Sequence, residues 1–263
     1  MDHSHEMQHF SMGIWLVFLA YGVSVVGCVV GLACTRQSAV VSSPRARFGW
    51  LAMAAVSIGG IGIWLMHFIA MLGFTVTGSV ARYDLLWTVV SALLAIGATL
   101  VGLLIIGRKV NIWTLLVGGV VMGIAVNVMH YTGMNAVRIQ GSVSYDTTLV
   151  AVSVAIAVVA GTLSLWFTLV LQKPMLLLAA GLVMGVAVVG MHYTGMAAMR
   201  VTVDPDAPVP AGLEVFGFLF PVFVIGLLAL AAPIAALFTL TDDEDDDIES
   251  MHLDQPQAPS RVS

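Results

Sequence analysis

The chain has 263 residues, of which 59% are hydrophobic and only 10% are charged, and its mean hydropathy is +1.00. A soluble domain is about a quarter charged and about half apolar, so this composition excludes an ordinary soluble protein and, in practice, a nucleic-acid-binding protein. The formal charge of −5 carries little information, because much of the acidity lies in one C-terminal run.

The first twelve residues are rich in histidine and methionine and contain no lysine or arginine. A secretory signal begins with a positively charged region, so we expect the first apolar stretch to be retained as a helix. His3, His5, Met7 and His9 are candidates for capturing a metal ion from outside the cell, and the alternative is an ordinary polar leader.

Seven apolar stretches follow, each long enough to cross a hydrocarbon core of about 30 Å as a helix. We expect membrane helices at residues 10–34, 48–74, 85–106, 112–137, 147–171, 175–199 and 213–240. Pro174 directly precedes the sixth stretch, as a proline at a helix N-terminus does. Pro221 and Pro233 lie inside the seventh stretch and predict a kink there. The chain is thus predicted to be an all-α membrane protein with seven transmembrane helices.

Positive charge in the connecting loops predicts the orientation of these helices. The loops after the first, third and fifth stretches contain Arg36, Arg45, Arg47, Arg108, Lys109 and Lys173. The loops after the second, fourth and sixth stretches contain only Arg82, Arg138 and Arg200. The more basic set is therefore expected in the cytoplasm, which places the N-terminus outside and the C-terminus inside a plasma membrane.

The C-terminal residues 241–263 differ from the membrane domain at residues 1–240. They hold an uninterrupted acidic run at 242–247 and then a segment rich in proline, serine and glutamine. Such a composition is typical of a disordered, solvated tail, here in the cytoplasm. The tail is too short for a kinase or nucleotide cyclase domain, so we expect any signal to reach a separate, unidentified cytoplasmic partner.

One short phrase occurs three times along the chain. It reads MHFIAM at 66–71, MHYTGM at 129–134 and MHYTGM at 191–196, and its histidines are 63 and 62 residues apart. A period of this length indicates that one structural unit is used three times. Because the repeats run in the same sense, we expect three helix pairs around a pseudo-threefold axis along the membrane normal, with the seventh helix outside them.

The histidines of the phrase, called here the motif histidines, are His67, His130 and His192. A rise of 1.5 Å per residue places all three about 26–28 Å from the cytoplasmic face, near the outer edge of the membrane. A methionine follows each histidine by four residues, so the two side chains lie on one helix face. These outer methionines are Met71, Met134 and Met196. The inner methionines, Met66, Met129 and Met191, point elsewhere and are expected to surround the ligands or to pack.

These residue types favour binding of a soft metal ion. Thioether sulfur together with imidazole selects copper, above all Cu(I), and disfavours calcium and magnesium, which prefer oxygen. Haem held by histidine and methionine is the weaker alternative. A single histidine in a membrane often only packs or hydrogen-bonds a neighbour, but three at one depth are a candidate functional site. No grouping typical of a catalytic centre accompanies the phrase, so we do not expect an enzyme.

The phrase resembles the tetrad that gives the bacterial MHYT family its name. The second and third copies match it, whereas the first reads Met66-His67-Phe68-Ile69 and lacks both hydroxyls. The resemblance implies an integral membrane sensor that binds copper through these Met and His residues and senses dioxygen, carbon monoxide, nitric oxide or redox state. A copper transporter or carrier is the alternative function, and a haem-binding membrane redox protein is a further one.

Overall fold

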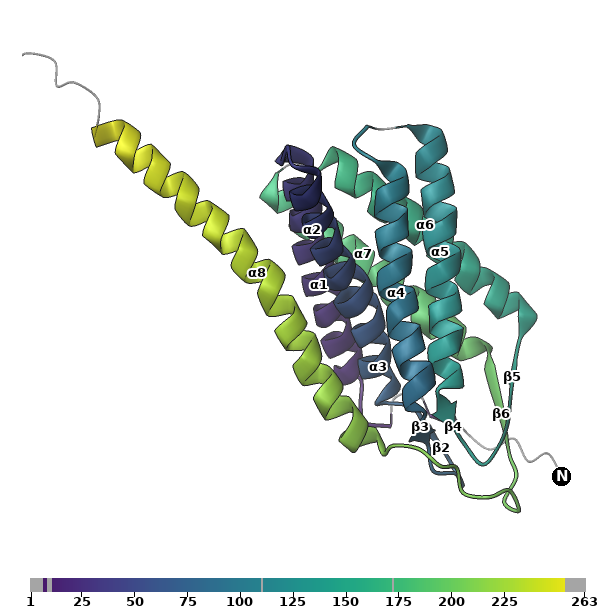
Figure 1. Cartoon of the computed structure of the whole chain (residues 1–263). Coiled ribbons are helices and arrows are strands. Elements are labelled where there is room, and N and C mark those ends of the chain that lie inside the picture. Colours follow the sequence, from purple (N-terminus) through teal and green to yellow (C-terminus); the bar gives the residue numbers. More distant parts are fainter. Residues whose placement is uncertain (1–6, 9–10, 110, 172, 254–263) are drawn as a thin grey trace, which may run out of the picture.

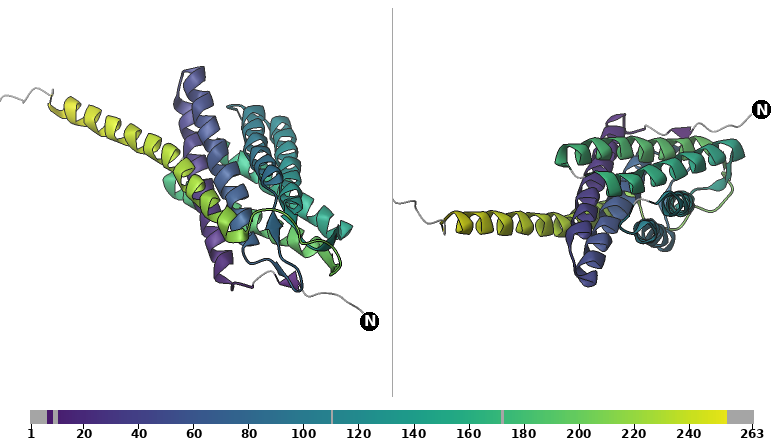
Figure 2. Two further views of the ribbon diagram at one scale, coloured as in Figure 1. Left: turned by 60° about the horizontal axis from the view of Figure 1, so that its bottom comes forward. Right: turned by 90° about the horizontal axis from the view of Figure 1, so that it is seen from above.

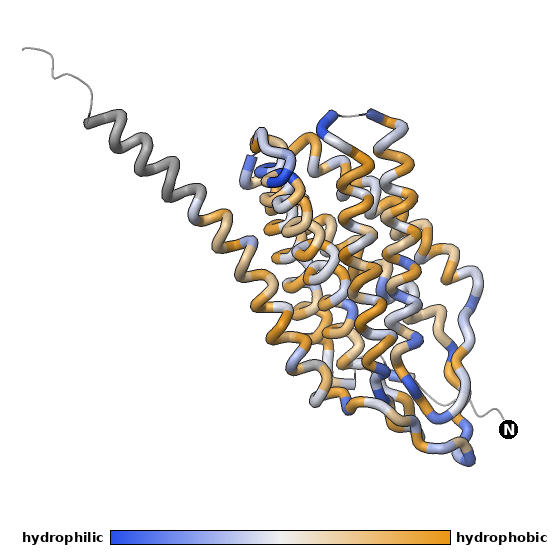
Figure 3. The backbone as a smooth tube through the Cα atoms, in the orientation of Figure 1, coloured by the Kyte–Doolittle hydropathy of each residue, from blue (hydrophilic) through white to orange (hydrophobic). Residues whose placement is uncertain are grey.

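The computed structural model describes residues 7–8, 11–109, 111–171 and 173–253. Seven helices in this part are long and apolar enough to cross a membrane: Trp15–Val40, Pro44–Met71, Leu85–Ile106, Ile112–Asn135, Thr147–Val170, Pro174–Ala198 and Phe220–Thr239. The limits of the second to sixth helices agree with the sequence prediction to within four residues. The first helix begins five and ends six residues later than predicted, and the seventh begins seven residues later. Apolar residues fill the middle of the bundle, and hydrophilic residues gather at its two ends (Figure 3).

The helices are α1 (Trp15–Val40), α2 (Pro44–Ala55), η1 (Val56–Leu65), α3 (Met66–Met71), α4 (Leu85–Ile106), α5 (Ile112–Asn135), α6 (Thr147–Val170), α7 (Pro174–Ala198) and α8 (Val215–Leu253). The first six membrane helices form a closed ring. α1 packs on η1, η1 on α4, α4 on α5, α5 on α6, α6 on α7, and α7 returns to α1. α8 lies outside this ring, against η1 and α1 (Figures 1 and 2). The predicted arrangement of three helix pairs plus a seventh helix is confirmed.

The second membrane helix contains a π-helical stretch that the sequence pattern did not predict. η1 continues α2 into α3 without a break, directly before the first motif histidine. Glycines allow very close packing on both sides of η1: a Cβ on Gly59 of η1 would lie 2.5 Å from the carbonyl oxygen of Ala95, and one on Gly27 of α1 would lie 2.5 Å from the amide nitrogen of Gly62. π-Helical turns are rare in proteins overall, and those that occur are often found at functional sites.

Short strand pairs close the end of the bundle that carries the motifs. The strands are β1 (Met7–Gln8), β2 (Thr75–Val76), β3 (Arg82–Tyr83), β4 (Val137–Arg138), β5 (Gly141–Tyr145) and β6 (Met199–Val203). β1 pairs with β2, β3 with β4 and β5 with β6, all antiparallel. Each repeat is therefore a strand, a helix, a second helix and a strand that returns to the first. Strands of two to five residues next to long apolar helices have too short an alternating pattern to be predicted from the sequence.

Two aspartates in the loops at the motif end of the bundle cap helix N-termini. Asp84 accepts hydrogen bonds from the amides of Leu86 and Trp87 and pairs with Arg138 at 3.1 Å. Asp146 occupies the equivalent position before α6 and pairs with Arg200 at 2.9 Å. In the second and third repeats the aspartate thus joins the start of the first helix to the strand that follows the second helix.

We expect Asp84→Ala to destabilise the protein by about 1 kcal/mol, because the cap of α4 is lost. Asp84→Asn keeps an amide oxygen as the acceptor for the cap and removes only the ion pair.

The hydrogen bond from Arg138 lowers the pKa of Asp84 below its ordinary value. The pair therefore stabilises the folded chain above the ordinary carboxyl pKa, and this contribution is lost as the pH falls through the lowered pKa. Thermal unfolding in detergent at several pH values measures both effects; equal acid sensitivity in wild type and Asp84→Asn would argue against the pair.

The last helix continues into the segment at 241–263 for which the sequence predicts a disordered tail, and disorder of that tail in solution stays a prediction. α8 runs through both Pro221 and Pro233 as one helix and continues to Leu253, so it includes the acidic run. A helix that is already nucleated by a long apolar stretch propagates at low cost, which explains why the acidic residues follow in the same conformation. Residues 254–263 lie outside the described part of the chain.

Candidate metal centre

The three motif histidines, 62 to 125 residues apart in the chain, meet in the centre of the ring. They stand on α3, α5 and α7, the second helix of each repeat, and are 0–1% exposed. The Nδ1 atom of His67 lies 3.0 Å from that of His192 and 3.2 Å from that of His130. Ring centroids are 4.9–5.2 Å apart, with the rings nearly perpendicular to one another. The structure thus brings together the residues predicted from their equal depth.

Hydrogen bonds among the three Nδ1 atoms cannot all form at the same time. A neutral imidazole nitrogen carries either one proton or one lone pair in the ring plane. The Nδ1 atom of His67 faces two other Nδ1 atoms at hydrogen-bonding distance, so it can form only one good hydrogen bond at a time. Imidazole nitrogens that share a zinc-sized ion lie about 2.0–2.1 Å from it, and nitrogens a little over 3 Å apart can therefore share one ion.

The opposite edges of the His67 and His130 rings each lie against a glycine of the next repeat. A Cβ on Gly133 would lie 2.7 Å from Nε2 of His67, and a Cβ on Gly195 would overlap Nε2 of His130. The Nε2 atoms of His67 and His130 are buried and have no hydrogen-bond partner in the described residues. The glycine of the MHYTGM phrase therefore has a role that the sequence analysis missed. It makes room for a histidine from another helix, which fixes Nδ1 toward the centre.

An aromatic ring flanks each motif histidine on its own helix. Phe68, Tyr131 and Tyr193 pack edge-on against the histidine before them, with centroids 4.9–5.0 Å apart. The first copy therefore keeps this ring contact and loses only the hydroxyl. The Tyr131 hydroxyl lies 3.1 Å from Oγ of Ser153, which also receives a hydrogen bond from Asn127. Asn127 and Ser153 carry no signal in the repeated phrase, so the sequence alone does not predict this hydrogen-bonded group.

The outer methionines lie one turn beyond the histidines, toward the strand pairs. All three are 0–3% exposed and belong to one apolar cluster with Phe68, Tyr83 and Phe218. The inner methionines are 1–2% exposed and lie in the larger core of the helix bundle. Both sets are therefore buried around the motif histidines. Their direct contact with a metal ion stays a prediction.

The proposed metal-capturing leader is largely outside the described residues. His3, His5 and His9 are among the residues whose structure is not described, and Met7 is placed only as the first residue of β1. β1 pairs with β2, the strand after α3, so Met7 and Gln8 lie at the motif end of the bundle. Its role in capturing metal stays a prediction.

Seven membrane helices, a threefold internal repeat and a buried histidine cluster define a multi-pass integral membrane protein with a sensor-like centre. The sequence profile of the MHYT family, described as bacterial signalling protein N terminal repeat, matches residues 60–119, 123–181 and 185–246. The chain belongs to this family and is a membrane signalling protein of the bacterial plasma membrane. Each matched unit begins within a motif-bearing helix or its continuation, η1 for the first unit. Each matched unit then continues through the next membrane helix, which is α4 in the first unit, α6 in the second and α8 in the third.

Three relatives illustrate the similarity. The chain is 40% identical to the bifunctional diguanylate cyclase/cyclic di-GMP phosphodiesterase MucR of Pseudomonas aeruginosa over 162 residues, 59% of this chain and 23% of that protein. It is 32% identical to the cyclic di-GMP phosphodiesterase NbdA of the same species over 78% of this chain and 26% of that protein. It is 29% identical to the signaling protein YkoW of Bacillus subtilis over 82% of this chain and 27% of that protein.

The chain spans about a quarter of the length of these relatives, and the enzymatic activities in their names are those of the whole proteins. No solved structure matches the chain significantly.

Proposed function

We propose that this protein is a non-enzymatic membrane sensor whose motif histidines bind one copper ion near the outer face. The observation that carries the proposal is the convergence of three buried Nδ1 atoms, two of them 3.0 and 3.2 Å from the third. Burying three imidazoles in a membrane is costly unless their polar atoms gain partners, and a shared ion supplies a partner to all three. His67, His130 and His192 would be its ligands.

The surroundings favour copper over the alternatives. Three histidines alone would also suit zinc. The outer methionines add buried thioether sulfur one turn away, and sulfur with imidazole favours Cu(I). Haem fits poorly, because ring centroids only 4.9–5.2 Å apart leave no space for a macrocycle between the histidines. When bound, copper would supply a redox couple and an affinity for dioxygen, carbon monoxide or nitric oxide.

The position of the centre supports a route for the signal. The motif histidines join α3, α5 and α7, one helix from each repeat, so any change in their spacing moves all three repeats relative to one another. Packed helices respond by small shifts of about 1–2 Å rather than by continuous deformation. The more basic end of the bundle, expected in the cytoplasm, would present this shift to a partner. The names of MucR and NbdA suggest cyclic di-GMP turnover as the class of output.

Metal analysis and X-ray absorption of the detergent-purified protein test the proposal. We expect about one copper per chain after anaerobic reconstitution with Cu(I), and an absorption spectrum with imidazole and sulfur in the ligand shell. Addition of carbon monoxide is expected to produce an infrared band of a copper-bound carbonyl. A folded protein that takes up no copper, or that takes up zinc in preference to Cu(I), would refute the copper assignment.

Replacing the outer methionines with leucine separates their role as ligands from their role in packing. Leucine conserves the volume closely, and such swaps cost less than about 1.5 kcal/mol each. We expect the triple variant Met71→Leu, Met134→Leu, Met196→Leu to keep its fold and to lose Cu(I) affinity by at least tenfold, while Cu(II) affinity changes less. The matched control replaces Met66, Met129 and Met191 in the same way. Equal losses in the two variants would contradict a ligand role for the outer set.

A further inference from the structure

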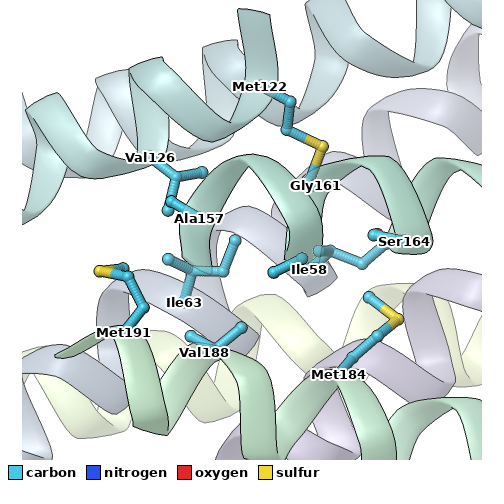
Figure 4. A pocket seen from close by; sticks show the side chains of 11 residues that line it. Ile58, Ile63, Met122, Val126, Ala157, Gly161, Ser164, Met184, Val188 and Met191 are labelled. Carbon is cyan, nitrogen blue, oxygen red and sulfur yellow. The ribbon is translucent and has the colours of Figure 1, made fainter. Parts of the chain in front are cut away.

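A second internal feature lies directly inward of the motif histidines. It is a small cavity of about 30 Å³ between η1, α5, α6 and α7 (Figure 4). Its lining residues are Ile58, Ile63, Met122, Val126, Ala157, Ala160, Gly161, Ser164, Met184, Val188 and Met191. None of them is a motif histidine, and nothing in the function proposed above uses the cavity.

The repeat places this cavity on the same axis as the metal centre. Ile63, Val126 and Val188 each lie four residues before a motif histidine, one helical turn inward of it. Met122 and Met184 lie one further turn inward on α5 and α7. All three repeats therefore contribute to the outer wall, and the distance from this wall to the histidines is about 5.4 Å, one turn of helix.

The chemistry of the wall selects a small apolar occupant. The lining is almost entirely aliphatic carbon and thioether sulfur. About 10–15 Å³ on the same measure holds one water, so the cavity has room for a molecule of two heavy atoms. A water also needs two to four polar partners, and cavities with apolar walls stay dry.

One hydroxyl interrupts the apolar wall. Ser164 is 4% exposed, its Oγ atom has no hydrogen-bond partner in the described residues, and it lines the cavity. A serine in a helix ordinarily bonds a carbonyl one turn back, as Ser57 does with Met53. An unpaired hydroxyl is costly in an apolar interior. A single donor of this kind suits a ligand with one weak acceptor atom at its end, as a diatomic gas has.

We propose that this cavity is the docking site from which an apolar diatomic molecule, such as dioxygen, reaches the metal centre. The proposal rests on the sensor function for the identity of its ligand, but the existence of the site does not depend on any metal. Apolar gases dissolve better in hydrocarbon than in water, so the surrounding bilayer would supply the ligand. Ser164 would orient the molecule, and Ile63, Val126 and Val188 would separate the docked molecule from the histidines.

Xenon is the probe, because it enters apolar cavities without needing a metal or a specific bond. We expect xenon-129 NMR of the metal-free, full-length protein in detergent to show one saturable internal site. Ala157→Val, which adds two methyl carbons to a buried lining residue, is expected to weaken xenon binding at least tenfold. Ala160→Val serves the same purpose if the first variant does not fold. The control is Ala155→Val, which adds the same atoms to an exposed position on the same helix.

The outcomes separate this inference from the sensor function. Xenon binding should persist in a variant that lacks the motif histidines, so failure of the copper proposal leaves the cavity result intact. Conversely, Ala157→Val should keep its copper but bind carbon monoxide at least tenfold more slowly than Ala155→Val. Absence of a saturable xenon site, or equal behaviour of the two alanine variants, would overturn the inference. Binding of a second Cu(I) that depends on Met122 and Met184 would also overturn it and favour a copper carrier.

Discussion

Replacing His67, His130 and His192 together with alanine is expected to abolish copper binding by the purified protein. These side chains supply every imidazole nitrogen of the proposed site, and they are the only group of three or more histidine, cysteine or acidic residues in the described part of the chain whose ligand atoms lie close enough to share an ion. Loss of a residue that hydrogen-bonds to a metal ligand typically lowers metal affinity about 10–100-fold. Loss of the ligands themselves must lower the affinity further. Single replacements should each reduce affinity at least 100-fold. Metal analysis and competition with a Cu(I) chelator measure both.

Two controls keep this result interpretable. Replacing His3, His5 and His9 in the leader should leave the affinity of the centre unchanged, and it should slow copper uptake only if the leader captures metal. Replacing each motif histidine with glutamine retains more of the side-chain volume and tests whether an alanine variant fails merely because it leaves a cavity. Circular dichroism and size-exclusion chromatography report folding. Full copper occupancy in a folded triple variant would show that the histidines are not the site.

Gly195→Ala is expected to destabilise the protein and to weaken the metal centre together. The added Cβ would overlap Nε2 of His130, whose ring is fully buried, so the ring must shift against its neighbours. Overpacking of a dense interior costs about 1–3 kcal/mol. Gly133→Ala places its Cβ 2.7 Å from Nε2 of His67 and should have a similar but smaller effect. Both variants should turn a histidine ring away from the position in which its Nδ1 faces the other two.

The matched control is Gly190→Ala, on the same helix as Gly195. A Cβ there meets no atom within 4 Å, and alanine is the better helix former, so this variant should be more stable than wild type by about 0.5–1 kcal/mol. Thermal unfolding of the metal-free protein and the copper affinity give the two readouts. If Gly195→Ala behaves as Gly190→Ala does, the glycine is present for helix packing in general and does not position His130.

The first repeat is the one that breaks the threefold symmetry. It has Ala70 where the other two have Gly133 and Gly195, Phe68 where they have tyrosine, and the π-helical η1 before its motif. His67 is also the histidine whose Nδ1 lies within 3.2 Å of the Nδ1 atoms of both His130 and His192. The three repeats therefore surround the motif histidines unequally, and the first repeat contributes the most distinct surroundings.

Much of the architecture follows from local properties of the chain. The length of each apolar run determines where a helix crosses the membrane, and the uneven distribution of Arg and Lys among the loops determines its direction. The repeat of the MHYTGM phrase places three histidines at one depth and makes their meeting on a common axis a prediction. These features can be predicted without knowing which residues meet in the fold, because hydrophobicity, charge and helical rise are properties of residues close together in sequence.

The chemistry of the centre depended on the tertiary structure. The contacts that orient Nδ1 inward join residues 63 and 125 positions apart, and the glycines that receive Nε2 belong to other helices. The strand pairs, the π-helical stretch and the cavity with its unpaired Ser164 hydroxyl likewise arise where elements from different repeats pack together. The sequence by itself thus determined which residues are available at one depth of the membrane. Only the packing of three helices decided which atoms of those residues face one another, because side-chain orientation depends on neighbours that are distant in the chain.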